Sequence, residues 1–232
     1  MKKSLFALLA LSIVLGSCSR SIKLKEYQTS ITHNGKYQIV TPAFTNYKFK
    51  SQNPFHAFVS EDGLIVGNYV GETNIVVYND YDEVFFHVTV APTYLLYIEP
   101  EIHFGDSKNS ILAQFGNPVQ SNESSCLFSN FDGSGCALLV SFNQANRVIA
   151  YTVLVPYSYY KELAYFLEER YKTNGSSNDT SYFINALEES EATMSVTVWP
   201  YNGNFWCVLY KPTSEKFSLS NSDLEQAASA VI

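Results

Sequence analysis

Hydrophobic and polar residues alternate with a period of two through the first third of the chain. Ile75 and Val77 share one face of a predicted strand, and alternate residues from Val84 to Val90 share one face of another. Turn residues separate these short runs at Asn34-Gly35, Asn53-Pro54, Glu61-Asp62-Gly63 and Asn79-Asp80. About seven short strands without a helical run predict a small all-β sandwich that ends near Ala91.

Beyond Pro92 the pattern changes, and two helices are predicted among strands. The first helix follows Gly105, and its apolar stripe consists of Ile111, Leu112 and Phe115. Asp106 or Ser107 can cap its start, while Gly116 and Pro118 end it. The second helix begins after Pro156 with Ser158 as the expected cap, and its apolar positions are Tyr160, Leu163, Phe166, Leu167 and Tyr171.

The remaining apolar runs after residue 92 predict strands. They are Tyr94–Ile98, Cys126–Phe131, Ala137–Phe142, Val148–Val155, Tyr182–Ala186, Met194–Trp199 and Phe205–Tyr210, with a loop at Asn174–Asp179. Two α-β-β-β units predict an α+β domain over residues 92–213, with an antiparallel sheet and both helices on one face. Residues 214–232 form a polar tail, in which Ser222–Glu225 has the spacing of a capping box and allows a short helix.

The opening residues have the pattern of a bacterial export signal. Lys2 and Lys3 precede an apolar run from Leu5 to Leu15, which is too short to favour a retained transmembrane helix. Leu15-Gly16-Ser17-Cys18 resembles the lipobox of bacterial lipoproteins. The resemblance implies cleavage after residue 17, acyl chains such as palmitate on Cys18 and a tether over residues 18–23. A secretory signal without a lipid is the alternative.

The net charge of the chain and its predicted export signal indicate where the protein is located and which partners it can bind. Without residues 1–17 the chain has 13 Lys and Arg against 22 Asp and Glu, a formal charge of −9. Nucleic acid is therefore not an expected partner, because its phosphates repel such a chain. Ser19 after the lipidated cysteine favours the outer membrane under the Gram-negative sorting rule. The chain faces either the periplasm or the cell surface.

Part of the first third also resembles a known family. Ser51–Val59 matches the S-x-N-x-x-x-A-x-V core of the bacterial Ig-like domain, group 2, and Ser60–Gly67 and Gly71–Ile75 match its next turn and strand entry. Phe49 stands where the family often has tryptophan. The resemblance covers residues 24–91. It implies an Ig-like spacer or adhesion module of envelope proteins, and such a fold does not by itself imply an activity.

A second, shorter resemblance lies at the predicted first helix. The fourteen residues Gly105–Pro118 are similar to a string in small outer-membrane lipoproteins of the BamE/SmpA type. This resemblance implies a role in envelope assembly.

The cysteines leave two alternatives open. Export would bring Cys126, Cys136 and Cys207 into an oxidising compartment, where one pair can form a disulfide. Cys126 and Cys136 flank the turn residues Asp132–Gly135, and a tight turn would place Phe131 opposite Cys136 instead. Buried free thiols are therefore preferred, and a Cys126–Cys136 disulfide is the alternative.

Signatures of catalysis are missing from the sequence. The histidines His33, His56, His87 and His103 show no metal-ligand spacing, and no G-x-S-x-G, phosphate-loop or dinucleotide motif occurs. Neither an enzyme nor a metal nor a cofactor is predicted.

Aromatic residues are the remaining candidates for binding. They cluster at the start of the second helix and around a predicted hairpin turn, at Tyr157, Tyr159, Tyr160, Trp199, Tyr201 and Trp206. Packing in the core is the alternative for each of them.

The predicted function is that of a monomeric, non-catalytic binding or adhesion protein. Lipid on Cys18 would hold it to a membrane, and the Ig-like spacer would present a C-terminal domain to a glycan or protein partner. The alternative is an accessory or structural subunit of an outer-membrane complex.

Overall fold

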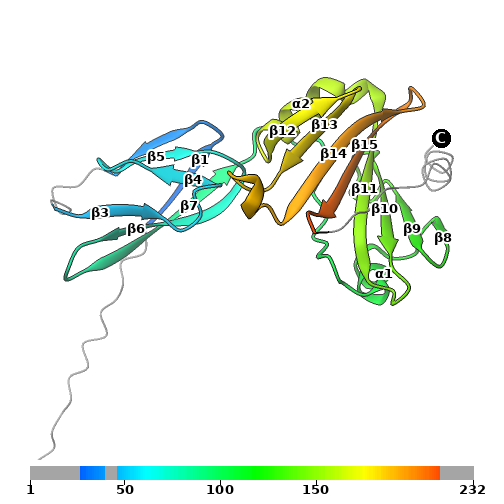
Figure 1. The fold of residues 1–232 in the computed structure, drawn as a ribbon, viewed down its shortest axis with the longest axis horizontal. Coiled ribbons are helices and arrows are strands. Elements are labelled where there is room, and N and C mark those ends of the chain that lie inside the picture. Colours follow the sequence, from blue (N-terminus) through cyan, green and yellow to red (C-terminus); the bar gives the residue numbers. More distant parts are fainter. Residues whose placement is uncertain (1–26, 40–45, 215–232) are drawn as a thin grey trace, which may run out of the picture.

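The computed structural model describes residues 27–39 and 46–214 (Figure 1). The predicted signal peptide, Cys18, the tether and the predicted terminal helix lie outside the described residues. We call residues 27–91 the first unit and residues 92–214 the second unit.

The first unit contains two sheets with one core between them. Its strands are β1 Tyr27–Thr32, β2 Lys36–Gln38, β3 Lys48–Ser51, β4 Ala57–Val59, β5 Leu64–Gly67, β6 Gly71–Tyr78 and β7 Glu83–Ala91. The sheets have the strand orders β1-β7-β6-β3 and β2-β5-β4, and β1 pairs with β7 in parallel. The alternating apolar residues of β6 and β7 point into the core, where Ile75, Val77 and Val88 are fully buried.

Gly71 enables the close approach of two parts of the first unit. Its φ of +141° is rarely adopted by other residues, and a Cβ atom there would collide with the His56 ring.

The second unit is built on one antiparallel sheet of eight strands. These are β8 Gln120–Ser121, β9 Ser125–Ser129, β10 Ala137–Phe142, β11 Val148–Pro156, β12 Lys172–Ser177, β13 Thr180–Ile184, β14 Met194–Tyr201 and β15 Phe205–Pro212. Their order is β12-β13-β14-β15-β11-β10-β9-β8. Its helices are α1 Lys108–Phe115, α2 Tyr160–Glu168 and the 3-10 turns η2 Tyr157–Tyr159 and η3 Glu189–Glu191.

Both α-helices contribute to the core on one face of this sheet, which we call the front face. Ile111 of α1 and Leu163 and Phe166 of α2 pack with alternate residues of β9, β10, β11 and β15. The other face, called the rear face, carries a second cluster: Leu127, Ala137, Leu139, Leu154, Phe205 and Cys207.

Glu169, directly after α2, connects the two units. Its backbone oxygen accepts a hydrogen bond from Val70 N at 2.7 Å. Its carboxylate oxygens accept from the N–H groups of Thr93 and Tyr94 at 2.9 and 3.0 Å. Residues 92–100, at the start of the second unit, are called the linker. The first unit and the linker are thus both attached to Glu169.

The β-rich fold with two short α-helices confirms the predicted predominance of strands. Three local predictions were wrong. Tyr94–Ile98 is not a strand, because Tyr97 turns into the front-face core while Leu95 and Ile98 remain exposed. Residues 174–177 belong to β12, although they were predicted as a loop, since backbone pairing with β13 outweighs their polar composition. Ser158 does not cap α2, which starts from the η2 turn without a side-chain cap.

Candidate functional site

The described residues hold no group of three or more His, Cys, Asp or Glu side chains that is suited to a metal ion. No helix within those residues has the length and apolar character needed to cross a membrane. Cys126, Cys136 and Cys207 are buried free thiols, so the alternative of a Cys126–Cys136 disulfide is not adopted. Burial raises the pKa of Cys136 to about 11, which makes it a poor nucleophile near neutral pH.

Two of the predicted binding residues, Tyr157 and Trp206, stack on each other. Their rings stack at 5.1 Å between centroids and are within 4° of parallel. The pair arises because β11 ends at Pro156 beside Phe205, where β15 begins. Tyr157 N donates to the Asn204 oxygen at 2.8 Å, and Trp206 Nε1 donates to the Tyr157 oxygen at 3.3 Å. The Trp206 ring is therefore held by a hydrogen bond to the backbone, and the Tyr157 ring packs against it.

Trp206 lies between two hollows of the second unit. An apolar hollow of about 160 Å³ lies against α2 and is lined by Tyr160, Leu163, Phe183 and Trp206, among others. A polar hollow of about 620 Å³ is lined by Tyr157, Trp206 and residues 176–181. Because Trp206 and Ser181 line both hollows, we treat them as one site, the Trp206 groove.

The polar side of the groove offers hydroxyl and amide groups. It is the hairpin between β12 and β13, whose turn residues Asn178 and Asp179 have φ angles of +48° and +61°. Asp179 is the one carboxylate among the described residues that line this side. A flat aromatic surface beside neutral hydrogen-bonding groups suits an uncharged, hydroxyl-rich ligand.

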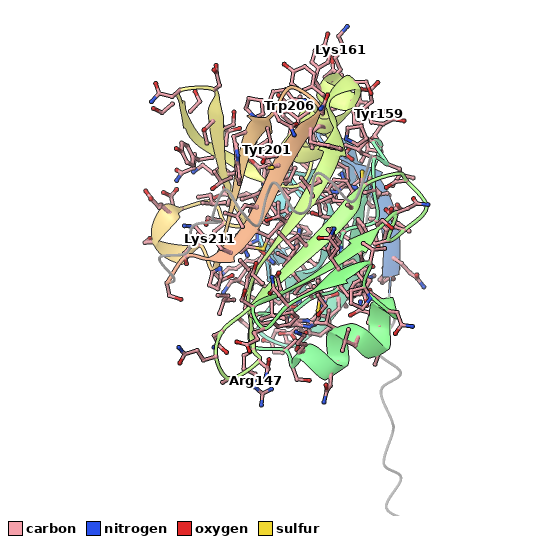
Figure 2. All side chains as sticks on the ribbon, turned by 90° about the vertical axis from the view of Figure 1, so that its right-hand side faces the viewer. Arg147, Tyr159, Lys161, Tyr201, Trp206 and Lys211 are labelled. Atoms are coloured by element: carbon pink, nitrogen blue, oxygen red, sulfur yellow. The ribbon has the colours of Figure 1, made fainter. Side chains whose placement is uncertain are left out.

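The other predicted aromatics divide between the two faces of the sheet. Tyr160 lines the apolar hollow, and Tyr159 is 41% exposed nearby at the start of α2. Figure 2 shows Trp206 toward the upper end of β15 and Tyr201 below it. Trp199 and Tyr201 pack against the rear-face cluster, because they pair with Cys207 and Phe205 and therefore share their face. The structure does not bring them to the groove.

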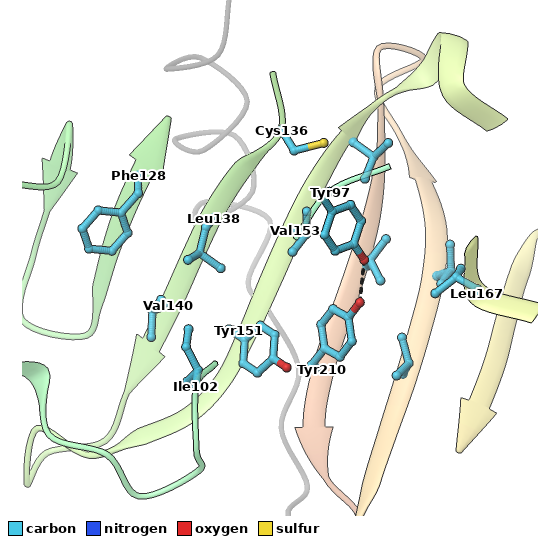
Figure 3. Packing of buried hydrophobic residues seen from close by; sticks show 14 of the residues in the cluster. Tyr97, Ile102, Phe128, Cys136, Leu138, Val140, Tyr151, Val153, Leu167 and Tyr210 are labelled. Atoms are coloured by element: carbon cyan, nitrogen blue, oxygen red, sulfur yellow. Dashed lines mark hydrogen bonds between the residues drawn. The ribbon is translucent and has the colours of Figure 1, made fainter. Parts of the chain in front are cut away.

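Sequence reasoning missed a buried polar network around Glu99. Its carboxylate accepts hydrogen bonds from the hydroxyls of Tyr171 at 2.5 Å and Tyr210 at 3.3 Å, and Arg170 Nε lies 3.3 Å away. Tyr97 bonds in turn to Tyr210 (Figure 3). Burial raises the pKa of Glu99, and the Tyr171 bond and Arg170 oppose this effect. These residues come from distant parts of the chain, so no local sequence motif predicts the network.

The polar groups of this network satisfy one another, which gives it a structural role. It holds the linker residues Tyr97 and Glu99 against the ends of α2 and β15. The Trp206 groove therefore remains the candidate for ligand binding.

Comparison with known proteins identifies no family for this chain. No family model matches it, and none of the curated proteins compared with it matches. Among solved structures it is similar to domains 4–9 of the surface layer protein SbsC, with 12% identity over 82% of this chain and 26% of that one and a TM-score of 0.25. For domains 1–6 of SbsC the identity is 12%, the coverage 81% and 22%, and the TM-score 0.24. The chain spans about a quarter of the length of these structures, and TM-scores this low support no inference about fold or function.

Proposed function

We propose that the protein is a non-catalytic, lipid-anchored component of the bacterial cell envelope that binds a glycan in the Trp206 groove. The observation that carries this proposal is the Tyr157–Trp206 stack beside the polar hairpin of residues 176–181. Tyr157 is 42% exposed, so the pair offers a flat apolar surface to solvent.

This arrangement suits the two chemical sides of a sugar ring. The C–H groups on one face of a sugar pack on an aromatic ring, and its hydroxyls exchange hydrogen bonds with Ser, Thr and Asn side chains. The Trp206 ring is already held by its hydrogen bond to the Tyr157 backbone oxygen and the Tyr157 ring stacks on it, so binding costs little side-chain entropy.

The remaining parts of the proposal follow from the sequence. Acyl chains on Cys18, each contributing roughly 0.8 kcal/mol per buried CH₂, would hold the protein to the outer membrane. Residues 24–91 would serve as an Ig-like spacer for the second unit, and the protein would act as a monomer.

The direct test is binding of the full chain, purified in detergent, to a panel of soluble polysaccharides and to isolated peptidoglycan. Trp206→Ala and Tyr157→Ala should each weaken binding about tenfold or more. Tyr182→Ala is the matched control, because Tyr182 is 39% exposed on the face of β13 opposite to the groove-lining Ser181 and Phe183. Binding that survives Trp206→Ala, or no binding to any glycan, would contradict the proposal.

Two exposed side chains favour a second candidate function, that of a subunit in an envelope-assembly complex. Leu95 and Ile98 of the linker are 79% and 71% exposed, beside the stacked rings of Tyr94 and Tyr165. Affinity capture from solubilised envelope should yield a stoichiometric protein partner that a Leu95→Asp, Ile98→Asp variant loses and Trp206→Ala retains. Capture lost only with Trp206→Ala would assign the partner to the groove instead.

A further inference from the structure

The two hollows of the Trp206 groove differ in what they can hold. The apolar hollow has a volume of about 160 Å³, whereas pockets that enclose a whole small ligand measure about 300–1,000 Å³. The polar hollow has a volume of about 620 Å³ and lies within that range. A single ligand can therefore place its body in the polar hollow and one small apolar substituent in the apolar hollow.

The apolar hollow lies between α2 and the sheet. Its floor crosses three neighbouring strands, because it is lined by Phe183 of β13, Val198 of β14 and Trp206 of β15. Leu163 and Ala164 of α2 line it from the other side. Phe183 and Val198 are buried in the front-face core while Ala164 is exposed, so the hollow leads from solvent to an apolar floor.

The lining of this hollow is neutral. None of the described side chains that line it carries a charge. Ser181 lies on the same side of β13 as Phe183 by alternation, and it also lines the polar hollow, so its hydroxyl lies where the two hollows meet. A substituent that passes this point needs an uncharged polar link and an apolar end, because a charged group would lose its hydration inside.

We infer that the groove recognises a glycan built of N-acetylated amino sugars. This inference rests on the proposed glycan-binding function and names the class of sugar. The sugar ring lies on the Tyr157–Trp206 stack, its acetamido group exchanges a hydrogen bond with Ser181, and the acetyl methyl group occupies the apolar hollow. Because Trp206 lines both hollows, the ring and its substituent lie side by side, as the direct attachment of the acetamido group to the ring requires.

Other substituents of sugars match the lining less well. The free amine of a deacetylated sugar is a cation at mildly acidic pH, and it would be desolvated against Leu163 and Phe183. The methyl group of a 6-deoxy sugar lacks the amide that bonds to Ser181. A hydroxyl in place of the acetamido group brings no apolar atom into the hollow.

Three soluble pentasaccharides with the same backbone linkage test the inference on the full chain purified in detergent. They are chitopentaose, its fully deacetylated form and cellopentaose. Calorimetry at mildly acidic pH should give chitopentaose a Kd at least about tenfold lower than that of cellopentaose, the usual effect of one small group in an apolar pocket. The deacetylated form should also bind more weakly than chitopentaose. Attraction to the formal charge of −9 that the chain has without residues 1–17 predicts the reverse order, which would overturn the inference.

Ala164→Leu should remove the preference for chitopentaose. The leucine side chain would fill the apolar hollow from α2, and leucine is a good helix former at this exposed position, so the fold should be kept. The affinities for chitopentaose and cellopentaose should then lie within about threefold of each other. Ala145→Leu is the matched control, because Ala145 is exposed between β10 and β11 and lines neither hollow, and it should keep the full preference. A full preference in Ala164→Leu would contradict the inference.

Saturation-transfer NMR on the unchanged chain needs no variant. Saturation of the protein should pass most strongly to the acetyl methyl protons of chitopentaose, because they lie against Leu163 and Phe183 in the apolar hollow. Stronger transfer to the ring protons than to the methyl protons would refute this placement of the ligand.

The outcomes also separate this inference from the proposed function. Equal binding of chitopentaose and cellopentaose, with both lost in Trp206→Ala, would refute the preference for acetylated sugars and leave glycan binding standing. Binding of none of the three would refute both.

Soluble peptidoglycan strands distinguish two sources of the same chemistry. Binding as tight as that of chitopentaose would support the inference and identify the cell wall as the source of the acetylated sugar. Much weaker binding of the strands than of chitopentaose would support it with a polysaccharide other than the cell wall as the source.

Discussion

The backbone oxygen of Glu169 accepts a hydrogen bond from the N–H of Val70 at 2.7 Å, which joins the first unit to the end of α2. The same residue uses its carboxylate to hold Thr93 and Tyr94 of the linker, and Arg170 Nη1 donates to it at 2.6 Å. Glu169 is 2% exposed. One buried residue therefore contacts the first unit, the linker and the second unit together.

Removal of the Glu169 carboxylate should destabilise the protein strongly. Glu169→Ala leaves two linker N–H groups without acceptors and the Arg170 charge with only its Glu99 partner, and breaking a buried ion pair costs about 3–5 kcal/mol. Urea unfolding of the full chain would measure the loss. Glu168→Ala is the control, because Glu168 is exposed and adjacent, and it should change the free energy of unfolding by less than about 0.5 kcal/mol. Equal effects of the two substitutions would contradict this role.

The stability of the second unit should depend on the ionisation of Glu99. Its pKa in the folded chain is raised above the ordinary value of 4.5, chiefly by burial. The folded state thus binds the proton more tightly than the unfolded state, and the stabilising contribution is complete below pH 4.5. It is lost as the pH rises through the raised pKa. Thermal melts from pH 4 to 7 should show the melting temperature of the wild type falling with pH. The fall should be smaller in Glu99→Gln. An unchanged slope would exclude Glu99 as its source.

Substitution of Gly71 should be more damaging than that of a glycine in open space. Gly71→Ala combines a positive φ with a collision against the His56 ring, whereas Gly105→Ala has a φ of +92° but no atom within 4 Å of the new Cβ. Backbone strain costs about 1–3 kcal/mol at either site, and the collision adds to it at Gly71 only. Denaturant unfolding would measure the free energy of unfolding of both variants, and the difference between them gives the cost of the collision with His56. A Gly105→Ala variant as unstable as Gly71→Ala would show that the His56 contact is unimportant.

The two α-helices should respond differently to loss of a serine hydroxyl at their starts. Ser107 Oγ accepts from Ser110 N at 3.1 Å and caps α1, so Ser107→Ala should cost about 1 kcal/mol. Ser158→Ala should cost less than about 0.5 kcal/mol, because no side chain caps α2. Equilibrium unfolding of both variants under the same conditions checks this difference. A larger loss of unfolding free energy with Ser158→Ala than with Ser107→Ala would contradict this prediction.

The sequence by itself determined most of the local structure. Period-two alternation located β6 and β7 within a few residues, because a strand with one buried face needs that pattern. Continuous apolar runs located β10 and β11, which are buried on both faces. The helix over Lys108–Phe115 was predicted with Asp106 or Ser107 as its cap and its end at Gly116, and the structure selects Ser107. The turn glycine Gly63, which has a φ of +82°, was recognised from its neighbours Glu61 and Asp62.

Only the tertiary structure decided which of these elements meet. Tyr157 and Trp206 are far apart in sequence, and they stack because β11 and β15 are neighbours in the sheet. The same pairing sends Trp199 to the rear face, which its distance from Trp206 along the chain does not reveal. Glu99 and Glu169 look like ordinary surface acids in the sequence. Glu169 is buried and Glu99 half-buried through contacts between residues about 70 to 110 positions apart, and local patterns carry no information about such contacts.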